Sequence, residues 1–268
     1  MALSLRQREI MEIARSSGQV LVDALALRFD VSPQTIRRDL GELCDTGLLQ
    51  RVHGGAVLES GVSNLIYETR RAIAREEKEA IGRACAAAVP NGASLILTIG
   101  TTTEAVARAL GRHRDLLVVT NNLNVAHILS ENPDCEVIVA GGRLRRSDAG
   151  VIGESAAAFL GRFKADIAVI GVSAIDPEGS LLDFDLSEAQ VTRAALANAR
   201  RRVLVADHTK FSRAAPVRVA EIETFDAIVT DRAPPAPFAA LCAEAGVQVE
   251  VAMGHAEDSE TAGTQAAE

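Results

Sequence analysis

A chain of 268 residues in which 48% are hydrophobic is long enough for one small and one medium domain, each with its own core. The four cysteines are scattered without a C-x-x-C pair, which argues against a structural zinc site and a disulfide framework. The absence of a basic and apolar leader and of a bilayer-length apolar run predicts a cytoplasmic protein without a membrane partner. The net charge of −8 disfavours non-specific attraction to nucleic acid, so any DNA affinity must come from the placement of cations.

Residues 31–43 predict a helix with a marked start and two sides of different chemistry. Ser32 stands at the N-cap position, and Pro33 stands at the first helical position, where its missing N–H costs nothing. At about 100° per residue, one side is apolar: Ile36, Leu40 and Leu43. The other side carries Gln34, Arg37, Arg38 and Gly41. Gln and Arg on such a helix suit contacts with base edges or phosphates, although paired arginines also occur on ordinary solvated helices.

The neighbouring segments favour the DNA-binding interpretation. Ser4 predicts the cap of a first helix that ends at Gly18, and Ala24 to Phe29 form a short second helix. Helix, short helix, tight turn and capped basic helix within about forty residues is the order of a helix-turn-helix. Residues 48–57 then alternate around Gly54-Gly55, which predicts a hairpin, or wing, close to the DNA phosphates.

Two motifs identify the chain as a member of a known family. Residues 31–40, Val-Ser-Pro-Gln-Thr-Ile-Arg-Arg-Asp-Leu, and residues 51–56, Arg-Val-His-Gly-Gly-Ala, resemble the signature of the DeoR family of bacterial transcriptional repressors. The resemblance implies a winged helix-turn-helix, a sugar-phosphate-sensing domain and an oligomer on operator DNA. It assigns DNA contacts to these residues: Ser32, Gln34, Thr35, Arg37, Arg38, Arg51 and His53.

One position departs from the family pattern. Leu21 stands where family members usually begin the second helix with Ser or Thr, and Leu27 is apolar where a charge is common. Because a missing cap costs about 1 kcal/mol, we expect packing to hold this helix.

The charge pattern of the N-terminal segment predicts an oligomer. Acidic residues offset its arginines, so the cations must lie on one face and the acids on another. One copy is then expected to bind DNA weakly, and a dimer or tetramer doubles or quadruples the contacts.

The rest of the chain predicts an α/β domain. We assign 1–58 to the winged helix-turn-helix, 59–75 to a linker, 76–252 to the sensor domain and 253–268 to a disordered polar tail. After a helix at 76–89, short Val- and Ile-rich runs alternate with helical stretches: Leu95–Ile99, Leu116–Val119, Val137–Ala140, Ile167–Ile170, Val203–Val205 and Ala227–Val229. Such runs predict buried parallel strands in an open, doubly wound sheet.

The strand ends of this predicted sheet carry the candidate ligand site, because open α/β sheets bind ligands at the carboxyl ends of their strands. Gly100-Thr101-Thr102-Thr103 opens a helix and resembles an anion cradle, although Thr at a helix start is often only a cap. The next strand ends carry Asn121-Asn122, Gly141-Gly142-Arg143, Gly171-Val172-Ser173 and Asp207-His208-Thr209-Lys210. Residues 183–188 add carboxylates that can accept from hydroxyls, or that merely cap the following helix.

These strand-end motifs resemble the DeoR sensor domain, which is similar to ribose-5-phosphate isomerase. The resemblance implies that phosphate is held by Lys78, Gly100, Thr101, Thr102 and Lys210. It implies that ligand hydroxyls face Asp183, Asp185, Glu188 and Asp207. The remaining predicted effector residues are Asn121, Asn122, Gly141, Gly142 and Arg143.

Three further patterns, at 119–126, 179–185 and 231–235, resemble family members that respond to glycerol-3-phosphate. The expected function is therefore a repressor of glycerol and glycerol-3-phosphate catabolism that leaves its operator when this metabolite binds. Thr98 stands where the family commonly has Asp, which keeps a different sugar-phosphate effector open. A sugar-phosphate isomerase is the remaining alternative. Because dinucleotide, P-loop and metalloprotease motifs are absent, we expect no catalytic residues, no cofactor and no metal.

Overall fold

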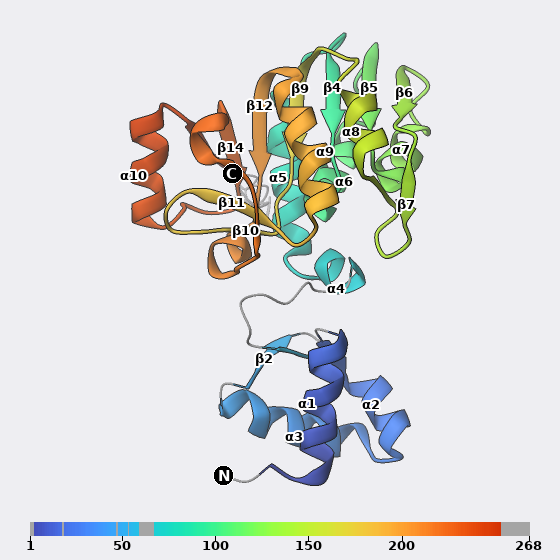
Figure 1. Cartoon of the computed structure of the whole chain (residues 1–268), viewed down its shortest axis with the longest axis vertical. Coiled ribbons are helices and arrows are strands. Elements are labelled where there is room, and N and C mark those ends of the chain that lie inside the picture. The colour runs from blue at the N-terminus through green and yellow to red at the C-terminus, as the bar shows by residue number, and fades with distance from the viewer. Residues whose placement is uncertain (1–2, 18, 47, 53, 59–66, 253–268) are drawn as a thin grey trace, which may run out of the picture.

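The computed structural model describes residues 3–17, 19–46, 48–52, 54–58 and 67–252. The N-terminal part, blue in Figure 1, contains α1 (Leu5–Ser17), β1 (Gln19–Leu21), α2 (Val22–Phe29), α3 (Pro33–Asp45), β2 (Leu49–Val52) and β3 (Gly55–Leu58). β2 and β3 form an antiparallel hairpin, and β1 pairs with the other edge of β3. This order confirms the winged helix-turn-helix and adds a short strand, β1, that the sequence pattern does not predict.

Helix α3 has the predicted start and the predicted two sides. The hydroxyl of Ser32 accepts from the amide of Thr35 at 3.2 Å, and Pro33 is the first helical residue. Ile36, Leu40 and Leu43 are at most 2% exposed and belong to the core of the N-terminal part. Burying a side chain of this size contributes about 1.5–3 kcal/mol, so these residues hold α3 in place.

Helix α2 starts without a side-chain cap, as the sequence indicates. Leu21 is its N-cap residue, has an extended backbone and makes no capping hydrogen bond. Val22, Leu25 and Ala26 are buried in the same core as α3. Packing therefore takes the place of the cap.

The C-terminal part is built on an open sheet of seven parallel strands, which contains all six predicted strands. In chain order they are β4 (Ser94–Leu97), β5 (Leu116–Thr120), β6 (Cys135–Val139), β9 (Ala165–Ile170), β12 (Ala199–Val205), β14 (Ala227–Thr230) and β15 (Gln248–Val251). The seventh, β15, is an edge strand whose residues are all exposed. It lacks the continuous apolar run of a buried strand, so the sequence pattern does not reveal it.

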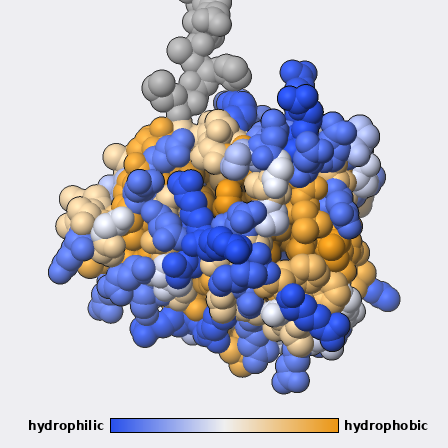
Figure 2. All heavy atoms as spheres, turned by 90° about the horizontal axis from the view of Figure 1, so that it is seen from above, coloured by the Kyte–Doolittle hydropathy of each residue, from blue (hydrophilic) through white to orange (hydrophobic). Residues whose placement is uncertain are grey.

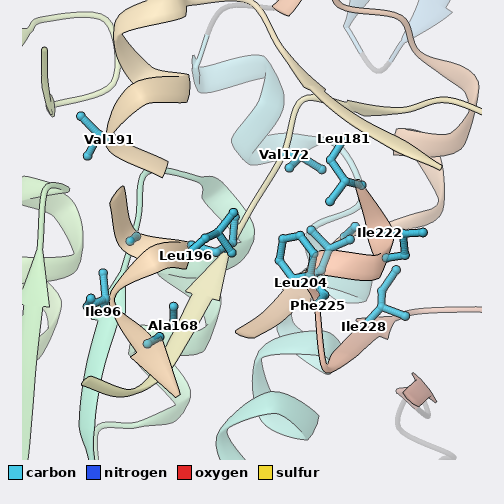
Figure 3. Close-up of a cluster of buried hydrophobic side chains, with 14 of the residues drawn as sticks. Ile96, Ala168, Val172, Leu181, Val191, Leu196, Leu204, Ile222, Phe225 and Ile228 are labelled. Carbon is cyan, nitrogen blue, oxygen red and sulfur yellow. The ribbon is translucent and has the colours of Figure 1, made fainter. Parts of the chain in front are cut away.

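The sheet is doubly wound. Its order is β15-β14-β12-β9-β4-β5-β6, so the chain starts in the middle, runs to one edge, returns to β9 and runs to the other edge. Ile96 faces one core together with α8 (Glu154–Leu160), α9 (Leu186–Ala197) and α10 (Ala236–Ala245). Its neighbours Leu95 and Leu97 face a second core with α5 (Arg75–Ala87), α6 (Thr101–Ala109) and α7 (Leu123–Leu129). Figure 3 shows the first core, where Leu204 and Ile228 of the strands lie close to Phe225 and Ile222.

Helices α5 and α6 approach each other unusually closely at Gly82. A Cβ added there would lie 2.6 Å from the main-chain oxygen of Ala105. No side chain fits at that distance, so Gly82 is what allows the start of α6 to lie against α5.

Several short elements surround the carboxyl ends of the strands. β7 (Arg143–Arg145) and β8 (Gly150–Ile152) form a hairpin, and β10 (Ala174–Ile175), β11 (Ser180–Asp183) and β13 (Val217–Glu221) form a small antiparallel sheet. The 3-10 helices are η1 (His208–Ser212) and η2 (Ile222–Thr224). Helix α4 (Tyr67–Ala72) lies within the range assigned to the linker and, in Figure 1, below α5 and α6. The predicted tail at 253–268 lies outside the described residues.

The opposite end of the C-terminal part, remote from α4, is seen from above in Figure 2. Hydrophilic side chains dominate the centre of this view, and hydrophobic ones show on both sides of them. Within the described ranges, no helix combines the length and the apolar character that crossing a membrane requires.

Candidate functional site

The exposed side of α3 and the wing together form a basic surface. Gln34, Arg37 and Arg38 are exposed, and Arg51 on β2 is exposed as well. Arg37 and Arg51 line one groove of about 90 Å³ between the helix and the wing. The structure thus brings two of the three predicted arginines together from different elements. His53, also predicted to contact DNA, lies outside the described residues.

The remaining predicted residues of α3 have local roles as well. The Thr35 hydroxyl lies 2.9 Å from that of Ser32, so the two hydroxyls share a hydrogen bond at the start of the helix. Arg38 makes an exposed pair with Glu42 at 3.3 Å, four residues later, which is worth only a few tenths of a kcal/mol and leaves its donors available.

Two acidic residues of α3 contact α1. Asp39 is buried and pairs with Arg6 at 2.5 Å, and Gln7 donates to Glu42 at 2.8 Å. The hydrogen bond from Arg6 to Asp39 is also the main reason why the pKa of Arg6 is raised. Asp39 is therefore separated from the basic surface as predicted, whereas Glu42 contacts both α1 and Arg38 of that surface.

A buried group of cations lies at the carboxyl ends of the C-terminal sheet. Lys78 of α5 and Lys210 of η1 are 3% and 7% exposed, and the carboxylate of fully buried Asp207 lies 4.0 Å from the Lys78 amine. Half-buried Arg213 and Arg70 act electrostatically on both lysines. We call Arg70, Lys78, Lys210 and Arg213, with Asp207, the cation cluster.

The pKa shifts within the cation cluster follow from burial and from its excess of positive charge. Burial lowers the pKa of Lys78 to about 8 and that of Lys210 to about 7, because Asp207 offsets the loss of solvation only in part. Burial lowers the pKa of Arg213 as well. Burial alone would raise the pKa of Asp207, but Lys210 and Lys78 outweigh it and leave this pKa below its usual value. Asp207 is thus ionised at neutral pH.

The predicted anion cradle lies next to this cluster. Gly100, with φ of 154°, is the N-cap residue of α6, and no side chain makes a capping hydrogen bond there. The threonines therefore do not act as the cap, and the Thr103 hydroxyl instead donates to the carbonyls of Thr98 and Gly100. Thr101 and Thr102 are buried, and Thr101 lines a pocket of about 270 Å³ that Lys78 also lines. A Cβ added at Gly100 would lie 3.9 Å from Gly171 Cα, so the ends of β4 and β9 meet here at the switch point of the sheet.

The two predicted asparagines have structural bonds. Asn122 caps α7 by accepting from the amides of Asn124 and Val125. Asn121 is buried and donates to the carbonyl of Val151 at 2.9 Å, while its Oδ1 has no hydrogen-bond partner among the described residues. Of the two, Asn121 therefore keeps a free buried acceptor.

The predicted residues at the end of β6 lie on the surface. Gly141, Gly142 and Arg143 are all exposed, in the loop before β7 and at its start. Arg145, two residues after Arg143, is the arginine that reaches the buried carboxylates. Its guanidinium contacts Asp148 at 2.6 Å.

The acids of residues 183–188 form a second group with Arg145. Arg145 contacts Asp185 at 3.0 Å and Glu188 at 2.5 Å, and Asp185 also caps α9, so the cap alternative holds for this residue. We call Asp148, Asp183, Asp185 and Glu188, with Arg145, the carboxylate cluster.

Two members of the carboxylate cluster are shifted toward the neutral form. Burial and, to a smaller extent, the nearby charge of Asp183 raise the pKa of Glu188 to about 8. Burial also raises the pKa of Asp183, which accepts from the Ser173 hydroxyl at 2.8 Å. The pair can therefore offer both a donor and an acceptor to a ligand hydroxyl.

Three residues of these clusters escape prediction from the sequence: Arg70, Arg145 and Arg213. Arg213 lies three residues after Lys210 in one turn, which is a usable signal. Arg70 lies in a charged stretch without apolar periodicity, where the sequence gives no sign that a side chain is buried.

Glu77, His208 and Asp231 place possible metal-ligand atoms within 4.8 Å of one another. His208 Nδ1 and its main-chain amide both bond to Asp231, at 2.7 Å each. These bonds already account for the group, and we assign no metal to it.

A basic winged helix-turn-helix joined to an α/β domain with a buried cationic site defines a ligand-responsive DNA-binding protein. The "DeoR-like helix-turn-helix domain" model matches residues 6–61, and the "DeoR C terminal sensor domain" model matches residues 73–232. The chain belongs to the DeoR family of transcriptional regulators and is not an enzyme.

Curated relatives match over nearly their whole length. The chain is 45% identical to the glycerol-3-phosphate regulon repressor of Escherichia coli (strain K12), covering 92% of this chain and 98% of the relative. It is 45% identical to the repressor of the same name from Haemophilus influenzae, covering 87% and 91%. It is 43% identical to the HTH-type transcriptional repressor CsqR of Escherichia coli (strain K12), covering 91% and 94%.

Among solved structures, ribose 5-phosphate isomerase A from Methanocaldococcus jannaschii has a TM-score of 0.38 and 15% identity, over 52% of this chain and 55% of that one. This likeness is too low to bear on function.

Proposed function

We propose that the protein is a repressor that leaves its operator when a phosphorylated small molecule, glycerol-3-phosphate, binds at the carboxyl ends of the sensor sheet. The observation that carries the proposal is the cation cluster, in which Lys78, Lys210 and Arg213 act on the single carboxylate of Asp207 and Arg70 adds a fourth positive charge beside the lysines. Buried charge of one sign without a counter-charge is costly, and a phosphate dianion supplies that counter-charge.

The two clusters suit the two ends of such a molecule. The phosphate would accept from Lys78, Lys210 and the arginines, and the hydroxyls would face Asp183 and Glu188. Arg70 acts electrostatically on Lys78 and on Asp183, so the two clusters are near enough for one small molecule to contact both. A free phosphate ion would satisfy only the first cluster.

The repressor function rests on the family and on the basic surface of α3. A 100-fold loss of operator affinity requires only about 2.8 kcal/mol of difference in effector affinity between the DNA-bound and free forms. A phosphate with several charge-assisted hydrogen bonds supplies that much. Because the chain carries a net charge of −8, we propose that a dimer or tetramer binds the operator.

The choice of effector within the family depends on more than overall similarity. CsqR is nearly as similar to this chain as the glycerol-3-phosphate regulon repressors are, so overall similarity does not select the effector. Another sugar phosphate is the second candidate. Thr98 supports that alternative, because its buried hydroxyl has no hydrogen-bond partner among the described residues at the end of β4, where the family commonly has Asp.

Calorimetric titration of the full chain tests the proposal. Glycerol-3-phosphate is expected to bind more tightly than fructose-1-phosphate, deoxyribose-5-phosphate, glycerol or inorganic phosphate, and to release a fluorescent operator in parallel. Tighter binding and release with another sugar phosphate would establish the second candidate. Failure of every phosphorylated compound to bind would refute the proposed sensor site.

A further inference from the structure

Helix α4 is held over the carboxyl ends of the sheet by side chains of the candidate effector site. The Tyr67 hydroxyl donates to Glu104 Oε2 at 2.7 Å and accepts from Asn124 Nδ2 at 3.1 Å. At the other end of the helix, Lys78 Nζ donates to the main-chain carbonyls of Arg70 and Ile73. The ties of α4 to the sensor domain are therefore polar, and one of them comes from the cation cluster itself.

Arg70 has an unfilled hydrogen-bonding position inside the site. Its side chain is 15% exposed, and one terminal nitrogen lies 3.3 Å from Asp148. Its Nε is buried and has no hydrogen-bond partner among the described residues. A buried N–H of a charged group without an acceptor costs about 1–3 kcal/mol. A bound ligand with an acceptor atom at this position would recover that free energy.

The bond to Asp148 uses only one nitrogen of Arg70, at 3.3 Å, and Asp148 is shared with a second arginine. Arg145 already donates to both oxygens of Asp148, at 2.9 and 2.6 Å. Arg70 instead acts electrostatically on Lys78, Lys210 and Arg213 on one side and on Asp183 on the other. Because the same guanidinium lies 3.3 Å from Asp148, Arg70 is the member of the cation cluster that adjoins the carboxylate cluster, where an anion held by the lysines would meet it.

We propose that Arg70 is a direct ligand of the effector's anionic group, and that α4 is the segment through which effector binding reaches the DNA-binding domain. The proposal rests on the proposed function and names a ligand and a route that the sequence does not indicate. Helix α4 is the first described element after wing strand β3, so a change in its position alters the chain that enters the DNA-binding domain.

The same hydrogen bonds provide the coupling. The carbonyls of Arg70 and Ile73 take two of the three donors of the Lys78 amine, so an anion that accepts more than one hydrogen bond from Lys78 displaces one of these carbonyls. An anion that accepts from Arg70 Nε forms a bond to a side chain of α4 and so favours a position of the helix that makes this bond. Effector binding thus exchanges bonds that hold α4 in the free protein for bonds to the ligand.

The binding test compares three arginines changed to Gln in the full chain. Arg70→Gln removes the proposed donor. Arg71→Gln changes the exposed neighbour on the same helix, which lines the shallow pocket beside Lys78, and Arg83→Gln removes an exposed charge on α5. The probes are glycerol-3-phosphate and inorganic phosphate, titrated calorimetrically, with circular dichroism melts to check folding.

We expect Arg70→Gln to weaken binding of both probes at least about tenfold, because it removes a charge-assisted hydrogen bond, and Arg83→Gln to change it less than about twofold. Arg70→Lys, which keeps the charge, is expected to fall in between. If wild type binds the probes and Arg70→Gln binds them with equal affinity, this inference alone is overturned. If wild type binds no phosphorylated compound, the proposed function is overturned. A weakening in Arg71→Gln that equals or exceeds that in Arg70→Gln would place the anion outside the buried site and also overturn it.

The coupling test uses Tyr67→Phe, which keeps the ring and removes the hydroxyl bonds to Glu104 and Asn124. The measured quantity is the ratio of operator dissociation constants with and without saturating effector. We expect the ratio to fall about tenfold from the wild-type value, as the removal of one hydrogen bond to a charged group implies. By reciprocity, operator DNA then has an equally reduced effect on effector affinity. An unchanged ratio would show that α4 does not transmit the signal.

Discussion

Replacing Lys210 with Met separates the stability of the sensor domain from its response to ligand. Lys210 is 7% exposed, and its amine is surrounded by three further cations and one carboxylate, that of Asp207. Met preserves the length and the apolar stem of the side chain but removes the charge. We therefore expect Lys210→Met to melt at a higher temperature than wild type without ligand, and to lose most of its ligand response.

The expected magnitudes follow from the buried charge. A fall of the Lys210 pKa from 10.5 to about 7 corresponds to a cost of about 4–5 kcal/mol for keeping the amine charged in this site. Without the charge, the attraction to Asp207 also disappears, which offsets part of the gain. For the ligand, removing one charge-assisted hydrogen bond of about 1.5–3 kcal/mol weakens binding roughly 10- to 150-fold.

Thermal melts with and without glycerol-3-phosphate measure both effects. At a concentration 100 times the wild-type dissociation constant, the ligand stabilises wild type by about 2.7 kcal/mol, which raises the melting temperature by about 5–11 °C. A variant that binds 100-fold more weakly gains only about 0.4 kcal/mol, or less than about 2 °C. Lys164→Met is the matched control, because Lys164 is exposed in part and is the only other lysine in the sequence besides Lys78 and Lys210. A ligand-induced shift in Lys210→Met equal to that of wild type would refute the role of this lysine.

Three further predictions concern the helix start, the DNA surface and pH. Leu21→Ser adds the missing cap of α2 and should stabilise the N-terminal domain by about 1 kcal/mol without weakening operator binding. The control Leu27→Ser, at an exposed position within α2, should give no such stabilisation. A melting temperature of Leu21→Ser equal to or below that of wild type would contradict this prediction. Arg37→Gln should weaken operator binding and should lower the slope of log affinity against log salt concentration by about one for each phosphate that Arg37 neutralises. Fluorescence anisotropy of a labelled operator measures both quantities. An unchanged slope would show that Arg37 does not contact the DNA phosphates. Effector binding at pH 8 should take up protons, because a bound dianion raises the pKa of Lys78 from about 8 and that of Lys210 from about 7. Effector affinity should therefore fall as the pH rises from 7 to 9. Proton uptake is measured by calorimetry in buffers of different ionisation heat, and proton release would argue against both lysines.

The sequence predicts those parts of the molecule that depend on local patterns. The start of α3 is determined by Ser32 and Pro33, which are adjacent in the chain, and its buried side by a simple helical period. Five of the six predicted strands, all except the edge strand β6, lie inside the sheet and are continuous apolar runs because both of their faces are covered. Edge strands β1 and β15 have an open side, so the pattern that identifies the interior strands is missing.

The candidate site could be predicted only where its residues follow strands. Lys210 and Asp207 come directly after β12, and the topology of a parallel sheet brings such positions together. Arg145 and Arg70 reach the same region from a hairpin and from a helix in the predicted linker, and no local pattern shows where such long side chains end. The prediction of Arg143 in place of Arg145 illustrates the difficulty, because both arginines lie in the same short strand of a hairpin and only the packing of that hairpin decides which one meets the buried acids.

The location of α4 decides whether the binding energy of a ligand can reach the DNA. A dianion that fills the cation cluster stabilises the sensor domain, but stabilisation confined to that domain leaves operator affinity unchanged. Operator affinity changes only if the ligand binds differently to two arrangements of an element that both domains share. In the mechanism proposed above, helix α4 is that element, since Lys78 donates to the carbonyls of Arg70 and Ile73, at and just after the end of the helix. A ligand that binds Lys78 and Arg70 would then act on the same groups that hold α4 to the sensor domain.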